Sequence, residues 1–347
     1  MYSATLAKAD LMAARKSQAG PVLRALDRLN RVLLGLQGEE WDEHDYSARE
    51  ELPAALLDGL QHLVAVIGEQ QVVQPAYLHR NPRLLDFYYS VLQFIRVAEN
   101  WGGEYRFILS RGRGKQSLAL HLNCLDPSRL LAQRQDRLHS VTAFSATLSP
   151  VEWARRRLGL GNHAVYSRQR SPFDPAQLEV ELATHIDTRY RARQASLPQL
   201  ADLVRRWLRE VDGNTIIYFP SYQYLRASLE LIADGLQGRS LWVQEPELSE
   251  IARDELLAMF ERSRNLVAFC ILGGIFGEGI DLPGEQLSSV VVVGVGLPQV
   301  NRNTELLRQW YQSRYGAGFE YAYLYPGMQK VDQALGRVIR RSRDRGR

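Results

Sequence analysis

The sequence predicts an α/β protein in which helices cover both faces of a parallel sheet. Three nearly continuous apolar runs lie in the C-terminal half, at residues 214–220, 265–274 and 287–298. Segments with apolar residues at helical spacing, such as 222–236 and 247–263, lie between them. Strands that are apolar along their whole length and alternate with helices are typical of parallel sheets that are buried on both sides.

The N-terminal hundred residues are predicted to be mainly helical. Residues 1–16 read as a helix, and three further stretches with helical spacing lie between residues 19 and 100. The acidic segment 38–51 separates the first two of these stretches, and we expect it to be an exposed loop.

The character of the sequence changes at Trp101. Short β-rich runs at 105–110 and 117–122 are predicted strands, joined by a basic turn that contains glycines. The apolar run 140–148 is expected to be a further strand.

Composition excludes several classes of protein. The 347 residues include 43 Lys and Arg against 39 Asp and Glu, and the net charge of +4 does not by itself indicate a nucleic-acid partner. Most of the excess lies between Lys330 and Arg347, which is either a phosphate-binding surface or a solvated helix face. Two distant cysteines, Cys124 and Cys270, make no disulfide framework. Without a signal pattern or a long apolar run, we expect a soluble intracellular protein.

The segment 333–346, QALGRVIRRSRDRG, carries the strongest chemical pattern. On a helix, Gln333, Arg337 and Arg340 would share one face, and Gly336 would leave room for another backbone. Two guanidinium groups on one face suit a triphosphate, as arginine fingers do. The alternative is a solvated basic helix whose spacing arose by chance.

A glycine-rich loop, 273–284, follows the second apolar run and carries Glu278, Gly279 and Asp281. Glycines at the end of a strand let the backbone approach a phosphate or sugar closely. Asp281 is placed to accept a hydrogen bond from a ribose hydroxyl or from an arginine of the neighbouring helix. An ordinary connecting loop with two solvated acids is the alternative.

Two further segments place hydroxyl groups where predicted strands end. FSATLSP carries Ser145 and Thr147, and YFPSYQYL carries Ser221 and Tyr222. Open α/β sheets bind ligands at the carboxyl ends of their strands. The Ser221 hydroxyl is also a predicted cap for the next helix, whose N-terminus could receive a phosphate.

In their order and separation, these four segments resemble the third to sixth motor motifs of the DinG/XPD family of superfamily 2 DNA helicases. CLDPSRLL at 124–131 also looks like the segment that precedes the third motif, and MYSATL resembles the segment after the DEAH box in bacterial members. The resemblance implies two RecA-like domains that clamp one ATP. It would make 1–18 and 101–150 the remainder of the first domain, 19–100 a helical arch-like insertion, and 151–347 a second domain that is incomplete at its end.

The resemblance also implies roles for individual residues. Arg337 and Arg340 would contact the γ-phosphate, and Gln333 would position the nucleotide or the attacking water. The remaining candidates divide between the nucleotide cleft (Glu278, Gly279, Asp281), coupling of ATP state to DNA grip (Ser145, Thr147) and the DNA backbone (Ser221, Tyr222).

The family's phosphate-binding loop does not occur in this sequence. The nearest string, RGRGKQS at 111–117, lacks the first glycine, and Asp42-Glu43-His44 matches the magnesium box only in its letters. We therefore expect a fragment that hydrolyses no ATP alone, with ATP and Mg²⁺ held mainly by an upstream motor half. The four cysteines of the family's 4Fe-4S cluster are also absent, so a cluster in the parent protein would lie outside this chain.

Partners follow from the resemblance alone. It implies single-stranded and forked DNA, 5′ to 3′ movement, the upstream motor half, no membrane, and a bacterial cytoplasmic protein that joins the nucleoid when it acts. The choice of DNA rather than RNA as the bound nucleic acid rests on the resemblance to the family. The alternative is a non-catalytic adaptor, derived from a helicase, that binds single-stranded nucleic acid.

Overall fold

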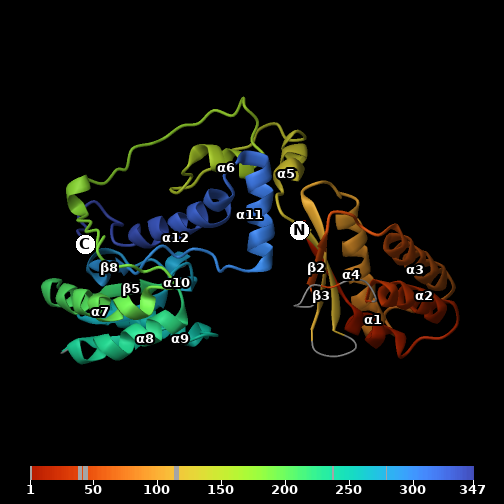
Figure 1. Cartoon of the computed structure of the whole chain (residues 1–347), viewed down its shortest axis with the longest axis horizontal. Helices are drawn as coiled ribbons and strands as arrows, with labels where there is room; N and C mark the ends of the chain where they lie inside the picture. The colour runs from red at the N-terminus through yellow and green to blue at the C-terminus, as the bar shows by residue number, and fades with distance from the viewer. Residues whose placement is uncertain (1, 38–40, 42–45, 113–116, 237, 279) are drawn as a thin grey trace. The chain divides into compact units, whose positions relative to one another are not determined.

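The computed structural model describes residues 2–37, 41, 46–112, 117–236, 238–278 and 280–347 (Figure 1). The chain forms two compact units. Unit 1 comprises Met1–Thr142 and Arg155–His163, and unit 2 comprises Ala143–Ala154 and Ala164–Arg347.

Unit 1 is a four-stranded antiparallel sheet covered by helices. The strands pair in the order β1-β4-β3-β2. Leu118, Leu120 and Leu122 are fully buried on one face of β4, as expected of a half-covered sheet. The elements are β1 Ala4–Ala7, α1 Lys8–Arg15, α2 Gly20–Gln37, β2 Tyr46–Arg49, α3 Ala54–Val73, α4 Pro82–Ala98, β3 Tyr105–Arg111, β4 Leu118–Cys124 and α5 Ser128–Gln135.

Unit 2 contains the predicted parallel sheet, with strand order β6-β7-β5-β8. Its elements are η1 Pro175–Gln177, α7 Arg193–Glu210, β5 Thr215–Phe219, α8 Tyr222–Ile232, η2 Ala233–Gly235, β6 Ser240–Val243, α9 Glu250–Arg262, β7 Leu266–Ile271, α10 Ile275–Glu278, η3 Gly284–Gln286, β8 Ser289–Val292, α11 Arg302–Tyr315, the π-helix η4 Glu320–Leu324 and α12 Tyr325–Leu335. Helix α6, Val151–Arg157, begins in unit 2 and ends in unit 1.

Along β5 of the parallel sheet, successive side chains point to opposite faces and pack into two different hydrophobic cores. Ile217 and Phe219 of β5 pack with α7 and α8, whereas Ile216 and Tyr218 pack on the opposite face with α9, α10 and α12. All five residues of β5 are buried. The predicted α/β fold class, with a parallel sheet covered on both faces, is confirmed.

Four local predictions were wrong. The chain opens with a strand rather than a helix, since Ala4 and Leu6 are buried and Thr5 between them is exposed. Part of the acidic segment forms β2, because Tyr46–Arg49 pairs with β3. Helix α12 ends at Leu335 and does not continue through Arg340.

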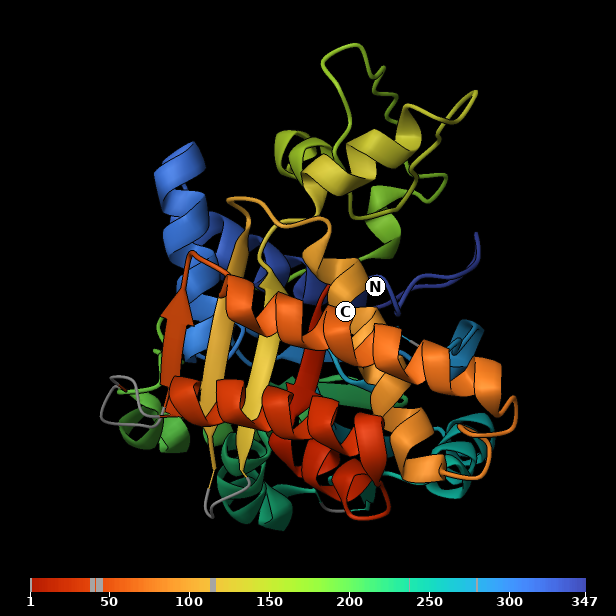
Figure 2. The same cartoon turned by 90° about the vertical axis from the view of Figure 1, so that its right-hand side faces the viewer.

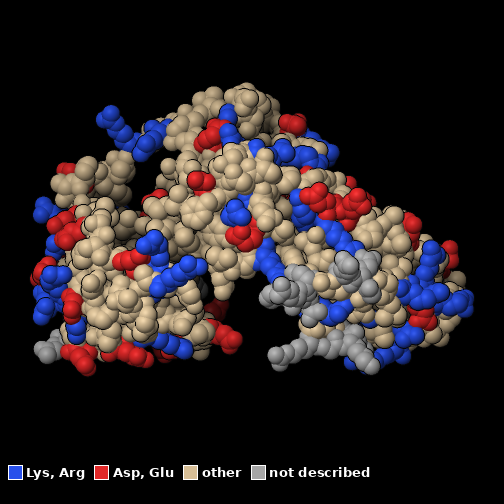
Figure 3. All heavy atoms as spheres, in the orientation of Figure 1, with Lys and Arg blue, Asp and Glu red and all other residues tan. Residues whose placement is uncertain are grey.

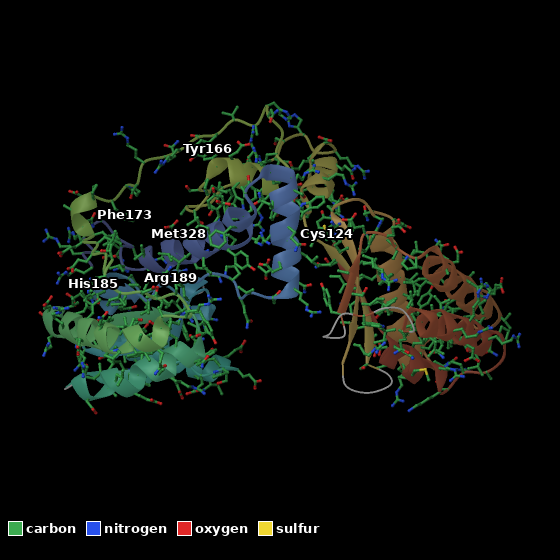
Figure 4. All side chains as sticks on the ribbon, in the orientation of Figure 1. Cys124, Tyr166, Phe173, His185, Arg189 and Met328 are labelled. Carbon is green, nitrogen blue, oxygen red and sulfur yellow. The ribbon has the colours of Figure 1, made fainter. Side chains whose placement is uncertain are left out.

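The run 140–148 is the fourth, because it forms no strand. No ladder in the described part of the chain pairs with it, and the Phe144 side chain is 89% exposed. A β-prone sequence gains the strand conformation only when neighbouring strands accept its hydrogen bonds. The segment between α6 and α7, residues 158–192, is also largely irregular and exposed, and it carries Tyr166 and Phe173 (Figure 4).

Asn214 stabilises the end of the parallel sheet at which its strands begin. It is fully buried, and its Nδ2 donates to the carbonyl oxygens of Phe260, Ser263 and Gln286 at 2.9–3.1 Å. Its Oδ1 accepts from the Leu266 amide at 2.9 Å. One side chain, directly before β5, therefore satisfies backbone groups at the start of β7, at the end of α9 and before β8.

Replacing Asn214 by alanine is expected to destabilise unit 2 by about 3 kcal/mol or more, because several buried backbone groups lose their partner at once. Hydrogen exchange of the β5 and β7 amides measures this, and about 100-fold faster exchange is expected. Asn265→Ala is the matched control, since Asn265 is exposed and donates to a single carbonyl, that of Gly238. Equal effects of the two substitutions would contradict this role of Asn214.

Candidate functional site

The carboxyl ends of β5, β6 and β7 lie at one edge of the parallel sheet, where ligands of open α/β folds bind. Ser221 follows β5, and its hydroxyl caps α8 by accepting a hydrogen bond from the Tyr224 amide at 3.3 Å. The predicted cap is confirmed.

Gln244 is a residue of this edge that sequence reasoning missed. Its side chain donates from Nε2 to the Tyr222 hydroxyl at 3.2 Å and accepts at Oε1 from the Ile271 amide at 2.9 Å. Gln244 is only 6% exposed, and partial burial raises the pKa of Tyr222. Gln244 thus connects the segments after β5 and β7. The available signal was its position near the end of the β-prone run 239–245, whose strand pairs with β7.

Tyr218 of β5 holds the loop that follows β7. Its buried hydroxyl donates to the Phe276 carbonyl of α10 at 2.8 Å, and burial raises its pKa. At the start of the loop, Gly273 has a φ of +74°, and a Cβ there would lie 2.6 Å from Cδ of Lys330. The close approach expected of this glycine is therefore made by a lysine of α12.

The Arg337 side chain donates hydrogen bonds to the backbone at the end of α10. Its Nε and Nη2 donate to the Gly277 carbonyl at 3.1 and 2.7 Å, and its Nη1 donates to the Ile280 carbonyl at 2.5 Å. The residue is half-buried, lying between α12 and the loop. The planar guanidinium group thereby links the backbone at Gly277 to the backbone at Ile280, in the loop after β7.

Arg340 lies in a more open position. Its Nε is 3.3 Å from Oδ1 of Asp281, and the two side chains are 34% and 76% exposed. The predicted contact between Asp281 and an arginine therefore exists. The buried Asp344 fixes the backbone here, since its Oδ2 accepts the amides of Arg340 and Arg341 at 2.8 Å.

The two arginines do not share a helix face with Gln333, contrary to the prediction. Helix α12 ends at Leu335, and Gly336 is its C-cap. Glycine lowers helix stability by about 1 kcal/mol relative to alanine, and beyond it Arg337 finds carbonyl partners on the loop. Among the described residues, the space at Gly336 is not used by another backbone, because a Cβ there would meet only the Asp332 and Gln333 carbonyls of its own helix, at 3.2 and 3.7 Å.

Ser145 and Thr147 do not follow a strand, but the fold connects them to α12. Oγ of Ser145 accepts from the Thr147 amide at 3.1 Å, which makes a local turn. The Thr147 carbonyl accepts from Nε2 of Gln329 at 3.0 Å, one helical turn before Gln333. Trp153 packs edge-on against Tyr325 at the start of the same helix.

The structure therefore brings Arg337, Arg340 and Asp281 together, with Gln333 on the last turn of α12 beside them. Ser221 and Tyr222 form a separate group on α8. The backbone of Glu278 lies at the end of α10, but its side chain and the whole of Gly279 lie outside the described residues, as does Asp42-Glu43-His44.

Metal-ligating clusters and membrane-spanning helices do not occur in the described part of the chain. There, no group of three or more His, Cys, Asp or Glu side chains is placed to hold a metal ion. None of the described helices has the length and apolar character needed to cross a bilayer.

Comparison with known proteins finds similarity to DNA helicases. Residues 204–347 match the model of the helicase C-terminal domain. The ATP-dependent DNA helicase XPD of Sulfolobus acidocaldarius is 21% identical over 66% of this chain and 40% of its own length. The ATP-dependent DNA helicase chl-1 of Caenorhabditis elegans is 22% identical over 74% of the chain and 33% of its own length. The chain thus spans about a third to two fifths of these relatives.

Solved structures agree in fold. An XPD helicase structure superposes with a TM-score of 0.57 at 19% identity, covering 99% of this chain and 60% of its own. Xpd4 of S. tokodaii gives 0.60 at 15% identity, with 99% and 66% covered. Residues 204–347 are thus similar to helicase C-terminal domains. Together with the order of the four motifs, these matches support the resemblance of the chain to the C-terminal region of DinG/XPD-family superfamily 2 helicases.

Proposed function

We propose that this chain is part of an ATP-dependent DNA helicase that moves on single-stranded DNA, in the 5′ to 3′ direction, and unwinds forked duplexes. In this proposal, 151–347 is the second RecA-like domain, and 1–18 with 101–150 is the remainder of the first. Residues 19–100 are an arch-like insertion. The observation that carries the proposal is that both arginines contact the loop after β7. Arg337 donates to its backbone carbonyls, and Arg340 pairs with its Asp281.

The arginine pair has the chemistry of half an ATPase site. Arg340 is the group best placed to contact a γ-phosphate, because its guanidinium is a third exposed and its partner Asp281 is largely exposed. Arg337 holds the loop that lines the nucleotide, and Gln333 positions the nucleotide or the water. Glu278, Gly279 and Asp281 complete this side of the cleft.

The other half of the site would come from an upstream motor domain. The sequence contains no G-x-x-x-x-G-K-[ST], so that half would supply the phosphate-binding loop and the carboxylates for Mg²⁺. The exposed run 140–148 supports this arrangement, because an apolar, β-prone segment gains partners when it joins a larger sheet.

The DNA side of the proposal rests on Ser221 and Tyr222, at the N-terminus of α8. A helix N-terminus with a hydroxyl cap is a favourable place for a backbone phosphate. Ser145 and Thr147 would pass the state of the ATP site to the DNA grip, since Gln329 ties their segment to α12.

ATP hydrolysis by the 347-residue chain, with and without single-stranded DNA, tests the half-site. No turnover above background is expected for the chain alone, and DNA-stimulated turnover is expected once the upstream motor half is present. A helicase-derived adaptor would instead bind single-stranded DNA and show no turnover in either form. Turnover by the isolated chain would overturn the half-site, and the segment 111–117 would then be the first to mutate.

A further inference from the structure

Helix α2 presents a row of arginines on its outer face. Its buried side packs into the core of unit 1 through Val22, Ala25, Leu26, Leu29, Leu33 and Leu36. Arg24, Arg28 and Arg31 are all exposed on the other side, at positions i, i+4 and i+7. Side chains at this spacing lie one above another along the helix. We refer to these three residues as the arginine stripe.

Among the described residues, the stripe has no carboxylate partner. Asp27 is the single acidic residue of α2, and it pairs with Arg15 of α1. Within the described part of the chain, no ion pair joins Arg24, Arg28 or Arg31 to an acid.

Other exposed helices of unit 1 differ. The outer face of α4 carries Arg83 and Arg96 with Asp86 between them, and α3 exposes Asp58 and Glu69. Figure 2 shows α2 and α3 as the layer that faces the viewer over the sheet. In Figure 3, Lys and Arg side chains gather over the end of unit 1 that these helices form.

The dimensions of the stripe fit a nucleic-acid backbone. With a rise of 1.5 Å per residue, the three arginines span about 10.5 Å along the helix. Phosphates of one strand of duplex DNA follow one another at about 3.4 Å along the axis, so the stripe faces three or four of them. The planar guanidinium fork matches phosphate oxygens in charge and geometry.

We propose that the arginine stripe binds the phosphodiester backbone of DNA and is a contact surface separate from Ser221 and Tyr222. The inference rests on the proposed function, in that the chain must act on DNA. Since arginine contacts to phosphate carry no sequence information, the surface holds the strand in register without reading its bases.

The test is salt-dependent binding of a fluorescent single-stranded oligonucleotide to the 347-residue chain. Each phosphate contact to a single strand contributes about 0.7 to the slope of log K against log salt. The variant Arg24→Gln/Arg28→Gln/Arg31→Gln is therefore expected to lower the slope by about 2. A hairpin duplex is measured in parallel, where the expected loss is about 0.9 per contact. The form of backbone that the stripe binds is the one whose loss reaches its own expected value, about 2 for the single strand or about 2.7 for the duplex.

The matched control is Arg80→Gln/Arg83→Gln/Arg96→Gln. It removes the same charge from exposed positions of the same unit, and it is expected to change the slope far less. Equal slopes for the two variants would overturn the proposal, because the effect would then follow net charge rather than position. If the stripe variant binds DNA with an unchanged slope, only the proposed contact at the arginine stripe is overturned. Failure of the unmodified chain to bind either probe would remove both the stripe and the proposed DNA contact.

Discussion

Replacing Arg340 by alanine is expected to lower ATP turnover by about 10³–10⁵-fold in the proposed helicase, as loss of an arginine finger does. The Arg340 guanidinium has an exposed ion-pair partner in Asp281. Exposed pairs contribute only about 0–1 kcal/mol, so the arginine can leave Asp281 and turn to a γ-phosphate at little cost. The charge that develops on the transferring phosphoryl group then loses its neutralising partner in the variant.

The measurement is steady-state kcat and KM for ATP at saturating single-stranded DNA. The loss is expected in kcat, with a smaller change in KM, because the contact strengthens in the transition state. Arg341→Ala is the control, since this neighbour is also exposed and its backbone amide keeps its bond to Asp344. A near-normal kcat in the Arg340 variant would end its assignment as a finger.

Arg337→Ala is expected to loosen the loop at 275–281 as well as to lower turnover. The side chain donates three hydrogen bonds to the carbonyls of Gly277 and Ile280. Hydrogen bonds to charged groups contribute about 1.5–3 kcal/mol each, and the loss leaves half-buried carbonyls without a donor. Arg337→Lys is expected to recover little, because an ammonium group cannot bridge both carbonyls as the planar fork does.

Hydrogen exchange of peptides from this loop, measured on the 347-residue chain itself, separates the two arginines. Exchange is expected to accelerate by about one to two orders of magnitude in Arg337→Ala and to stay near the unmodified rate in Arg340→Ala. If both variants exchange alike, Arg337 has no special part in holding the loop. The experiment needs neither ATP nor the upstream half, so it is independent of the proposed function.

The apolar runs predicted the α/β fold class, and the four motifs supplied the resemblance to helicases. The apolar runs around 216, 268 and 290 could only be buried strands, and the sheet they form is the one observed. Ser221 was recognisable as a cap because its hydroxyl serves an amide three residues away. Such local contacts depend on neighbours in the sequence, which are visible without a structure.

The helix expected through Arg340 failed for the opposite reason. Local spacing favoured a helix, but Gly336 lowers its stability. Arg337 instead donates to carbonyl oxygens of a loop that lies about sixty residues earlier in the sequence. The strand expected at 140–148 failed because its partners in a sheet are a tertiary matter. The role of Gln244 was hidden too, since its partners Tyr222 and Ile271 come from two other strand ends.

The sequence by itself determined the candidate residues of the proposed half-site, Gln333, Arg337, Arg340 and Asp281, and the order of the motifs that contain them. Only the tertiary structure decided how the two arginines differ. Arg337 is held by backbone carbonyls and Arg340 is left with an exposed carboxylate, because the chain turns after Leu335 and Asp344 fixes that turn. Hydrogen-bond partners distant in sequence set the environment of each guanidinium, and residue spacing carries no information about them.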